Sequence, residues 1–272
     1  MTAETHSRRG GVLGDMWVIA RRGFLHMRRQ PEALADVTIQ PVMFTLLFAY
    51  VFGGAIPVAG GSYREFLMGG IFAQTLVFGA FGVAMSLASD RTNGAIDRFR
   101  SLPMARSAIL GGHALSHWAR GLLPIALMSL CGLIVGWRIH TGVGDALAGY
   151  GLMILFLFAV IWIGILMGSV LPTPEAVQGV GFASIFPLTF IASTFVPVST
   201  LPGVLRPIAE WNPVTSMAEA LRRLFGNPHG DFGATPPFPL QHPVIYTLIW
   251  IGVIVAVCAP LAVFFHERSI RD

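Results

Sequence analysis

The sequence contains no lysine, because all 18 of its basic residues are arginine. An ATP-binding P-loop needs a lysine that contacts the β- and γ-phosphates, within the pattern G-x-x-x-x-G-K-S/T. This absence excludes ATP hydrolysis by a P-loop in this chain.

Charged residues of both signs are scarce. They make up 12% of the 272 residues, against about 25% in a typical soluble domain. Hydrophobic residues make up 54%, and the mean hydropathy is +0.68. Such a composition cannot cover a globule with charge, so we predict an all-α, polytopic membrane protein without a nucleic-acid partner.

Cysteine and metal-binding patterns are also almost missing. Cys131 and Cys258 lie in apolar stretches, so no disulfide framework is implied. His113 and His117 are four residues apart, but the glutamate of H-E-x-x-H is absent and no third ligand is near in the sequence. We therefore expect no metal site, no cofactor and no catalytic residues in the chain itself.

Six apolar segments are long enough to cross a membrane, which takes about 20 residues. They cover residues 37–57, 66–89, 107–137, 146–171, 176–200 and 243–265. Arg120 interrupts the third, whose uninterrupted part is 121–137. A charge inside a span indicates function by default, but this side chain could equally extend to the headgroups if the span starts later.

Arginine placement predicts the orientation. Residues 1–36, 90–106 and 266–272 contain six, four and two arginines, together 12, whereas the opposite side contains five. By the positive-inside rule both termini are cytoplasmic in a multi-pass protein of a bacterial plasma membrane. Residues 1–36 lack an apolar core with a cleavage site, so no signal peptide is expected.

The N-terminal segment 1–36 is predicted to be a cytoplasmic tail, followed by the transmembrane domain 37–272. Within the tail, residues 13–28 place Trp17 and Phe24 on one helical stripe flanked by arginines. This pattern is typical of an interfacial helix near anionic lipids, although a solvated linker would also fit it.

The connection 90–106 is the most densely charged part of the chain. Ile96, Phe99 and Leu102 recur every third residue, Gly94 can open a short helix, and Pro103 ends or kinks it. An apolar ridge in a polar rim suits a docking helix. A positively charged stop sequence with incidental apolar residues explains the same pattern equally well.

The segment 201–242 contains a predicted helix that begins after the Asn212-Pro213 cap and stops at Gly226. At about 21 Å it is too short to cross, so it should lie at or dip into the outer leaflet. Its apolar face should lie opposite Glu219, Arg222 and Arg223. The patterns Gly132-x-x-x-Gly136 and Gly164-x-x-x-Gly168 would permit close helix packing elsewhere.

Two blocks of sequence are familiar. They read Asp90…Gly94-Ala-Ile-Asp-Arg-Phe-Arg-Ser-Leu-Pro-Met-Ala-Arg106 and Phe195-Val-Pro…Leu201-Pro…Trp211-Asn-Pro-Val-Thr215, the second followed by Glu219-Ala-Leu-Arg222. With their order and spacing over residues 36–270, the chain resembles the permease subunits of type-2 ABC exporters, especially the daunorubicin-resistance branch. One departure is His113 and His117, where relatives usually have a basic and an acidic residue.

The resemblance implies an amphipathic connector helix, a cytoplasmic coupling helix that docks on a separate ABC ATPase subunit, and a re-entrant outer hairpin. The implied coupling residues are Asp90, Gly94, Ile96, Asp97, Arg98, Phe99, Arg100, Leu102, Pro103 and Arg106. The implied outer motif is Pro197, Pro202, Trp211, Asn212, Pro213, Thr215, Glu219 and Arg222. The partner would bind the ATP, and the permease would pair with itself or with a second permease.

The resemblance further implies export of a hydrophobic drug, antibiotic, polyketide or lipid. The alternative is a proton-coupled secondary multidrug transporter, which normally carries ionisable residues inside its spans. In this sequence every acidic residue lies in a loop or at the end of a predicted span. A membrane-embedded enzyme would need a polar catalytic cluster, which the sequence does not show.

Overall fold

The computed structural model describes residues 31–53, 56–58, 60–92, 106–230, 232 and 236–269, with side chains except at 31–38, 106–113 and 266–269. All regular secondary structure in these ranges is helical, which confirms the predicted fold class. The amphipathic helix predicted at 13–28 and residues 93–105 of the charged connection lie outside the described residues.

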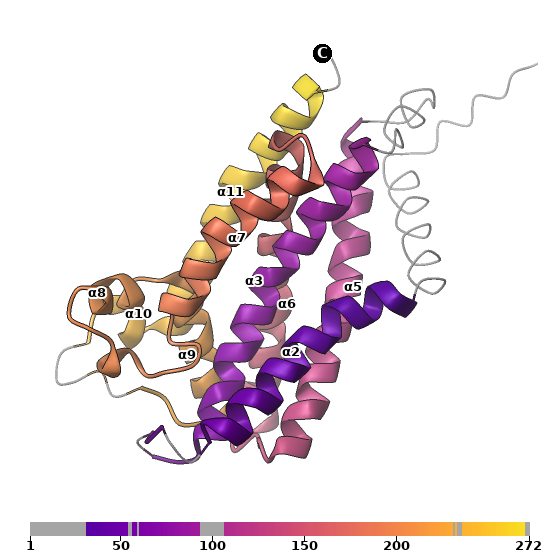
Figure 1. The fold of residues 1–272 in the computed structure, drawn as a ribbon. Helices are drawn as coiled ribbons and strands as arrows, with labels where there is room; N and C mark the ends of the chain where they lie inside the picture. Colours follow the sequence, from indigo (N-terminus) through magenta and orange to yellow (C-terminus); the bar gives the residue numbers. More distant parts are fainter. Residues whose placement is uncertain are drawn as a thin grey trace, which may run out of the picture.

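Two long helices, α3 (Tyr63–Thr92) and α6 (Val143–Val170), form the centre of the bundle. The helices α2 (Pro31–Val51) and α5 (Arg106–Val135) pack on one side of this pair (Figure 1). The helices α7 (Pro174–Ile191) and α11 (Pro243–Ser269) pack on the other side.

The close contact of α3 and α6 depends on two glycines of a predicted small-residue pattern. A Cβ atom on Gly164 would lie 2.3 Å from the carbonyl oxygen of Ala80, and one on Gly168 would lie 2.9 Å from that of Ala84. Only glycine allows this approach of the two backbones, so the pattern serves helix packing.

Four helices in the described part of the chain are long and apolar enough to cross a membrane: Tyr63–Thr92, Ala114–Val135, Val143–Val170 and Pro243–Phe265. The protein is therefore a multi-pass membrane protein. The described apolar part of α2, Ile39–Val51, is shorter. A count of six spans and the cytoplasmic location of the termini remain predictions.

The helix α7 ends at Ile191, whereas the sequence predicts one span over residues 176–200. Its last turn is closed by side chains from outside the helix, because Asn212 Nδ2 donates to the carbonyl of Leu188 and Thr194 Oγ1 to that of Thr189. The chain then turns into a short 3₁₀ helix, Val198–Thr200. Hydropathy alone does not reveal this break, since both parts are apolar and uncharged.

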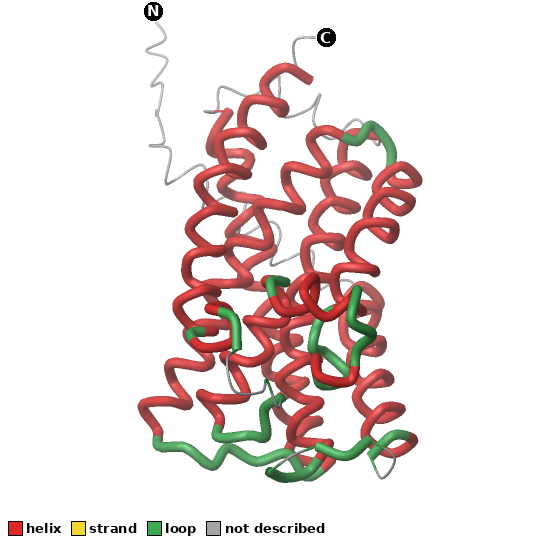
Figure 2. Tube along the Cα trace, turned by 90° about the vertical axis from the view of Figure 1, so that its left-hand side faces the viewer, coloured by secondary structure: helices red, strands yellow, loops and turns green. Residues whose placement is uncertain are grey.

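Three short helices follow: α8 (Leu205–Glu210), α9 (Pro213–Phe225) and α10 (Phe238–Gln241). Figure 2 shows short helical pieces partway along the bundle, above the loops that close its lower end. The helix α9 packs mainly on α3 and also on α11 and α6. Its 13 residues extend about 20 Å, so it enters the bundle without crossing it.

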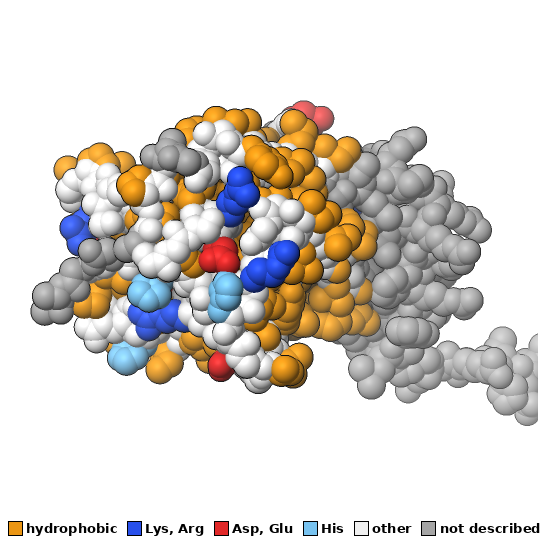
Figure 3. Space-filling model, turned by 90° about the horizontal axis from the view of Figure 1, so that it is seen from below, with side chains coloured by type: hydrophobic (Ala, Val, Ile, Leu, Met, Phe, Trp, Pro, Cys, Tyr) orange, Lys and Arg blue, Asp and Glu red, His pale blue; other side chains and the backbone are white. Residues whose placement is uncertain are grey.

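Polar side chains gather at the lower end of the bundle, within a rim of hydrophobic ones (Figure 3). At the start of α3, Glu65 contacts His140 of the α5–α6 turn at 2.7 Å, and Arg64 donates to the carbonyl of Val135. Asn227 Nδ2 donates to the carbonyl of Arg138 in the same turn. A polar end with an apolar circumference is the surface that a bilayer-spanning bundle needs.

Candidate functional site

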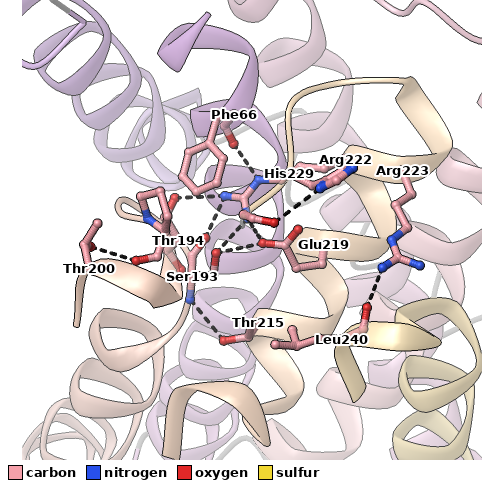
Figure 4. A network of polar contacts seen from close by, with 12 residues as sticks. Phe66, Ser193, Thr194, Thr200, Thr215, Glu219, Arg222, Arg223, His229 and Leu240 are labelled. Atoms are coloured by element: carbon pink, nitrogen blue, oxygen red, sulfur yellow. Dashed lines mark hydrogen bonds and ion pairs between the residues drawn. The ribbon is translucent and has the colours of Figure 1, made fainter. Parts of the chain in front are cut away.

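A buried ion pair on α9 joins three parts of the fold. Glu219 and Arg222 are both fully buried, and their Oε1 and Nη1 atoms are 2.5 Å apart. The sequence predicts that these residues lie opposite the apolar face of the helix, and the structure buries this polar side as well, because α9 inserts between α3 and the residues that follow α7 (Figure 4). Of the three charges predicted on that face, only Arg223 is exposed.

The Arg222 guanidinium has five hydrogen-bonded acceptors for its five N–H groups. Nε donates to the carbonyl of Phe66 on α3. Nη1 donates to Glu219 and to Ser193 Oγ, and Nη2 donates to the carbonyls of Ser193 and Thr194. One side chain therefore ties α9, the N-terminal part of α3 and the break after α7 together.

Two further interactions stabilise the buried cation. The guanidinium carbon of Arg222 lies 3.5 Å from the centroid of the Phe66 ring, which favours a cation electrostatically. Burial lowers the pKa of Arg222, whereas the charge of Glu219 and its hydrogen bond raise it. Arginine is not deprotonated in proteins, so the guanidinium remains charged.

The other residues of the predicted outer motif surround this pair. Asn212 caps α9 by accepting from the amide of Val214, and Pro213 is its first residue. Thr215 Oγ1 accepts from the amide of Ser193, which adds to the contacts between the break after α7 and α9. The structure thus brings Asn212, Thr215, Glu219 and Arg222 together.

The remaining members of the motif lie in other parts of the hairpin. Pro197 precedes the 3₁₀ helix, and the carbonyl of Pro202 accepts the first amides of α8. Trp211 is exposed at the end of α8 and stacks edge-on against Tyr246 of α11. These three residues shape the hairpin.

Sequence reasoning missed the residues of α3 that accept this hairpin. Tyr63 donates its hydroxyl to the carbonyl of Phe195, and a Cβ atom on Gly70 would lie 2.0 Å from the carbonyl oxygen of Thr194. On Gly69 it would lie 2.8 Å from the Arg222 side chain. The adjacent glycines were a visible signal, but nothing local indicated which segment they accept.

Replacing Gly70 with alanine is expected to destabilise the chain by about 1–3 kcal/mol, because the methyl group overlaps the Thr194 backbone. The matched control is Gly252→Ala on α11, where a Cβ atom meets nothing within 4 Å. Unfolding midpoints in detergent compare the two variants. Equal midpoints for both variants would show that the close approach of Gly70 to the Thr194 backbone does not constrain the residue at this position.

At the upper end of the bundle the charged connection begins against α6. Arg91, in the last turn of α3, donates to the carbonyls of Gly168 and Ser169 at the C-terminal end of α6. A cation is stabilised there by the helix dipole. The connection therefore starts from a fixed position on α3 and α6.

Most of the predicted coupling residues lie outside the described residues. Asp90 is a half-buried residue at the end of α3, and Arg106 begins α5. The members without a described position are Gly94, Ile96, Asp97, Arg98, Phe99, Arg100, Leu102 and Pro103. Their role as the coupling element stays a prediction.

Arg120 lies inside the single helix α5 and lines a cavity between α2, α3, α5 and α6. The choice between a functional charge and a side chain that extends to the headgroups stays a prediction. The cavity volume is about 370 Å³.

Comparison with known proteins gives consistent matches. The profile of the family described as "ABC-2 type transporter" matches residues 15–225. Daunorubicin resistance ABC transporter permease protein DrrB1 from Streptomyces coeruleorubidus is 30% identical over 261 residues, which cover 96% of this chain and 84% of the relative. Doxorubicin resistance ABC transporter permease protein DrrB from Mycobacterium tuberculosis is 24% identical over 267 residues, covering 95% and 90%.

Another relative, the putative transport permease ycf38 of Cyanophora paradoxa, is 24% identical over 217 residues, covering 78% of this chain and 74% of the relative. The profile match includes the charged connection and the outer motif through Arg222. The resemblance to daunorubicin-resistance permeases, which rested on those two blocks, is confirmed.

Proposed function

The chain belongs to the ABC-2 type transporter family, and we propose that it is the membrane-spanning subunit of an exporter driven by ATP hydrolysis in a separate ABC ATPase. The cargo is a hydrophobic compound that leaves the cell. The upper end of the bundle in Figure 1 faces the cytoplasm, and the hairpin with α9 faces outward. The functional complex contains two permeases, either identical or different.

The observation that carries this proposal is the position of α3. Its last turn leads into the charged connection and contacts α6 through Arg91, and its first turns hold the hairpin through Tyr63 and the carbonyl of Phe66. Its 30 residues extend about 45 Å, longer than the hydrocarbon layer. A displacement of the ATPase-docked connection can therefore reach the outer hairpin through one rigid helix.

The buried acid Glu219 is the feature that would support the alternative of proton-coupled transport. A proton carrier must change its charge in every cycle, yet this carboxylate is paired with Arg222 and accepts from Ser193. Breaking a buried pair costs about 3–5 kcal/mol. The contacts of Glu219 therefore suit a structural role better than a carrier role.

ATPase assays test the proposal directly. The purified chain is expected to hydrolyse no ATP, since it has no P-loop lysine, and the complex with its cognate ABC ATPase to be active and to contain two permease copies. Native mass spectrometry gives the stoichiometry. Hydrolysis by the rigorously purified single chain, or one permease with two ATPases, would contradict the proposal.

A further inference from the structure

The C-terminal end of α6 lacks hydrogen-bond donors that a continuing helix would provide. The carbonyl of Gly168 would normally accept from the amide of residue 172, but Pro172 has no N–H group. Pro174 removes the donor for the carbonyl of Val170 in the same way. Pro172 also disfavours a helical backbone at Leu171, which is extended with ψ at 128°. The helix therefore ends here with carbonyls that need donors from another part of the chain.

Arg91 of α3 supplies donors to this helix end. Its Nη1 atom donates to the carbonyl of Gly168 at 3.2 Å and to that of Ser169 at 2.9 Å. Gly168 thus receives from a neighbouring helix the hydrogen bond that Pro172 cannot provide. Because the donor belongs to α3, the interaction that completes α6 also joins the two helices.

The α6–α7 turn, residues 171–173, is packed against the same end of α3. The helix α7 starts directly after this turn. Ala84 and Ala88 of α3 and Val177 of α7 are fully buried in one apolar cluster, and Leu171 of the turn packs against it. The end of α3, the turn and the start of α7 therefore form one packed unit, to which Arg91 adds hydrogen bonds.

The outer ends of α3 and α7 are also joined by an arginine. Arg222 of α9 donates to the carbonyl of Phe66 on α3. It also donates to the carbonyls of Ser193 and Thr194, which follow α7. Arginine side chains thus link α3 to the segment of α6 and α7 at both ends, by Arg91 near the charged connection and by Arg222 near the hairpin. A movement of α3 along its axis is therefore transmitted to α7 at both ends.

We propose that Arg91 is a positioning residue of the exporter, which holds the α6–α7 turn to the end of α3 so that both helices follow a movement of the charged connection. This inference rests on the proposed function, because it requires an ATPase that docks on the connection. It adds α7 to the path between the ATPase and the hairpin. Without Arg91, α3 can move while α7 and the break after it lag behind.

A reporter on the hairpin measures this transmission. Val204, directly before α8, is 83% exposed, so a cysteine at this position is accessible to a membrane-impermeant maleimide. Cys131 and Cys258 are replaced with alanine, so that only the reporter reacts. The full-length permease is assembled with its cognate ABC ATPase in nanodiscs, and the labelling rate is measured without nucleotide and after trapping with ATP and vanadate. We expect the two rates to differ in the complex that retains Arg91.

Three substitutions test the role of the arginine. Arg91→Gln should remove the nucleotide-dependent change in labelling rate, while the ATPase still co-purifies and hydrolyses ATP. Arg91→Lys should keep part of the change, because an ammonium group can still donate to the same carbonyls. The matched control is Arg138→Gln, since Arg138 donates to the carbonyls of Leu133 and Trp137 in its own segment of the chain. This variant should show the full change.

A second substitution distinguishes positioning from a merely structural role. Pro172→Ala returns an N–H group to the position that would normally supply the carbonyl of Gly168. If Arg91 only completes the end of α6, adding Pro172→Ala to Arg91→Gln should restore the nucleotide-dependent change. If Arg91 links two helices, the double variant should regain the unfolding midpoint in detergent but not the change in labelling rate.

The inference is overturned if Arg91→Gln keeps the nucleotide-dependent change, if the double variant regains it, or if the unsubstituted complex shows none. Loss of ATPase binding in Arg91→Gln would also overturn it, because Arg91 would then act in docking. Each of these results leaves the proposed function in place, since the unsubstituted permease still assembles with the ATPase. An unsubstituted chain that binds no ABC ATPase would remove the proposed function and this inference with it.

Discussion

Replacing Arg222 with methionine is expected to destabilise the folded chain by about 3–5 kcal/mol, because it leaves the Glu219 carboxylate buried without its cation. The carbonyls of Phe66, Ser193 and Thr194 lose a donor at the same time. The loss of stability is measured as a shift in the unfolding midpoint of the purified chain in detergent.

The neighbouring helix provides a matched control. Arg206 and Glu210 of α8 form a partly exposed pair at 3.0 Å, in which 42% of the arginine side chain and 17% of the glutamate side chain are accessible. Arg206→Met should cost no more than about 1 kcal/mol, since an ion pair that water can reach is worth little. Equal losses of stability in the Arg206 and Arg222 variants would show that burial of the Glu219–Arg222 pair has no energetic consequence.

The double variant Glu219→Leu/Arg222→Met separates stability from transport. Apolar residues in place of a buried pair restore much of the lost stability. Transport should nevertheless stay well below that of the unsubstituted protein, because the break after α7 is no longer held to α3. Full transport by a restored double variant would limit the pair to a role in folding.

Replacing Phe99 with alanine is expected to abolish transport while leaving membrane insertion and expression near normal. If Ile96, Phe99 and Leu102 are the apolar anchors in the ATPase groove, losing one aromatic anchor costs about 2 kcal/mol or more, roughly a 30-fold loss of affinity. Inverting Arg98 and Arg100 to glutamate should have the same effect through repulsion. Co-purification of the ATPase measures the loss.

The control for this prediction is Phe264→Ala near the upper end of α11, where the ring is 57% exposed. The Phe264→Ala variant carries the same substitution outside the charged connection, so it should retain the ATPase. A Phe99→Ala permease that co-purifies normally and transports normally would identify 90–106 as a stop sequence. The N-terminal segment would then be the next candidate for docking.

The helix α9 shows how far local sequence carried the prediction. Asn212, Pro213 and Gly226 fix its ends through capping and a left-handed glycine, and these rules act within a few residues. The burial of its polar face was not predictable in the same way. An arginine on a short helix looks solvated unless one knows that the Phe66 and Ser193 carbonyls converge on it.

Arg120 gives a second example of the same limit. The sequence showed a charge in an apolar segment and left two explanations open, because periodicity does not show what faces a side chain. The structure places it with Gln74 of α3 in one cavity, 46 positions away in the chain. Only the packing of α3 against α5 brings two such distant residues together.

The sequence by itself determined that this is a membrane protein, that it is all-helical, which family it belongs to and that it lacks a P-loop. Composition and local motifs decide these properties. Tertiary structure decided where α7 ends, what Arg222 binds and which residues share the cavity. Each of these depends on contacts between segments far apart in the chain, such as the 156 positions between Phe66 and Arg222. In an apolar bundle such contacts leave little local trace, since every buried face has nearly the same composition.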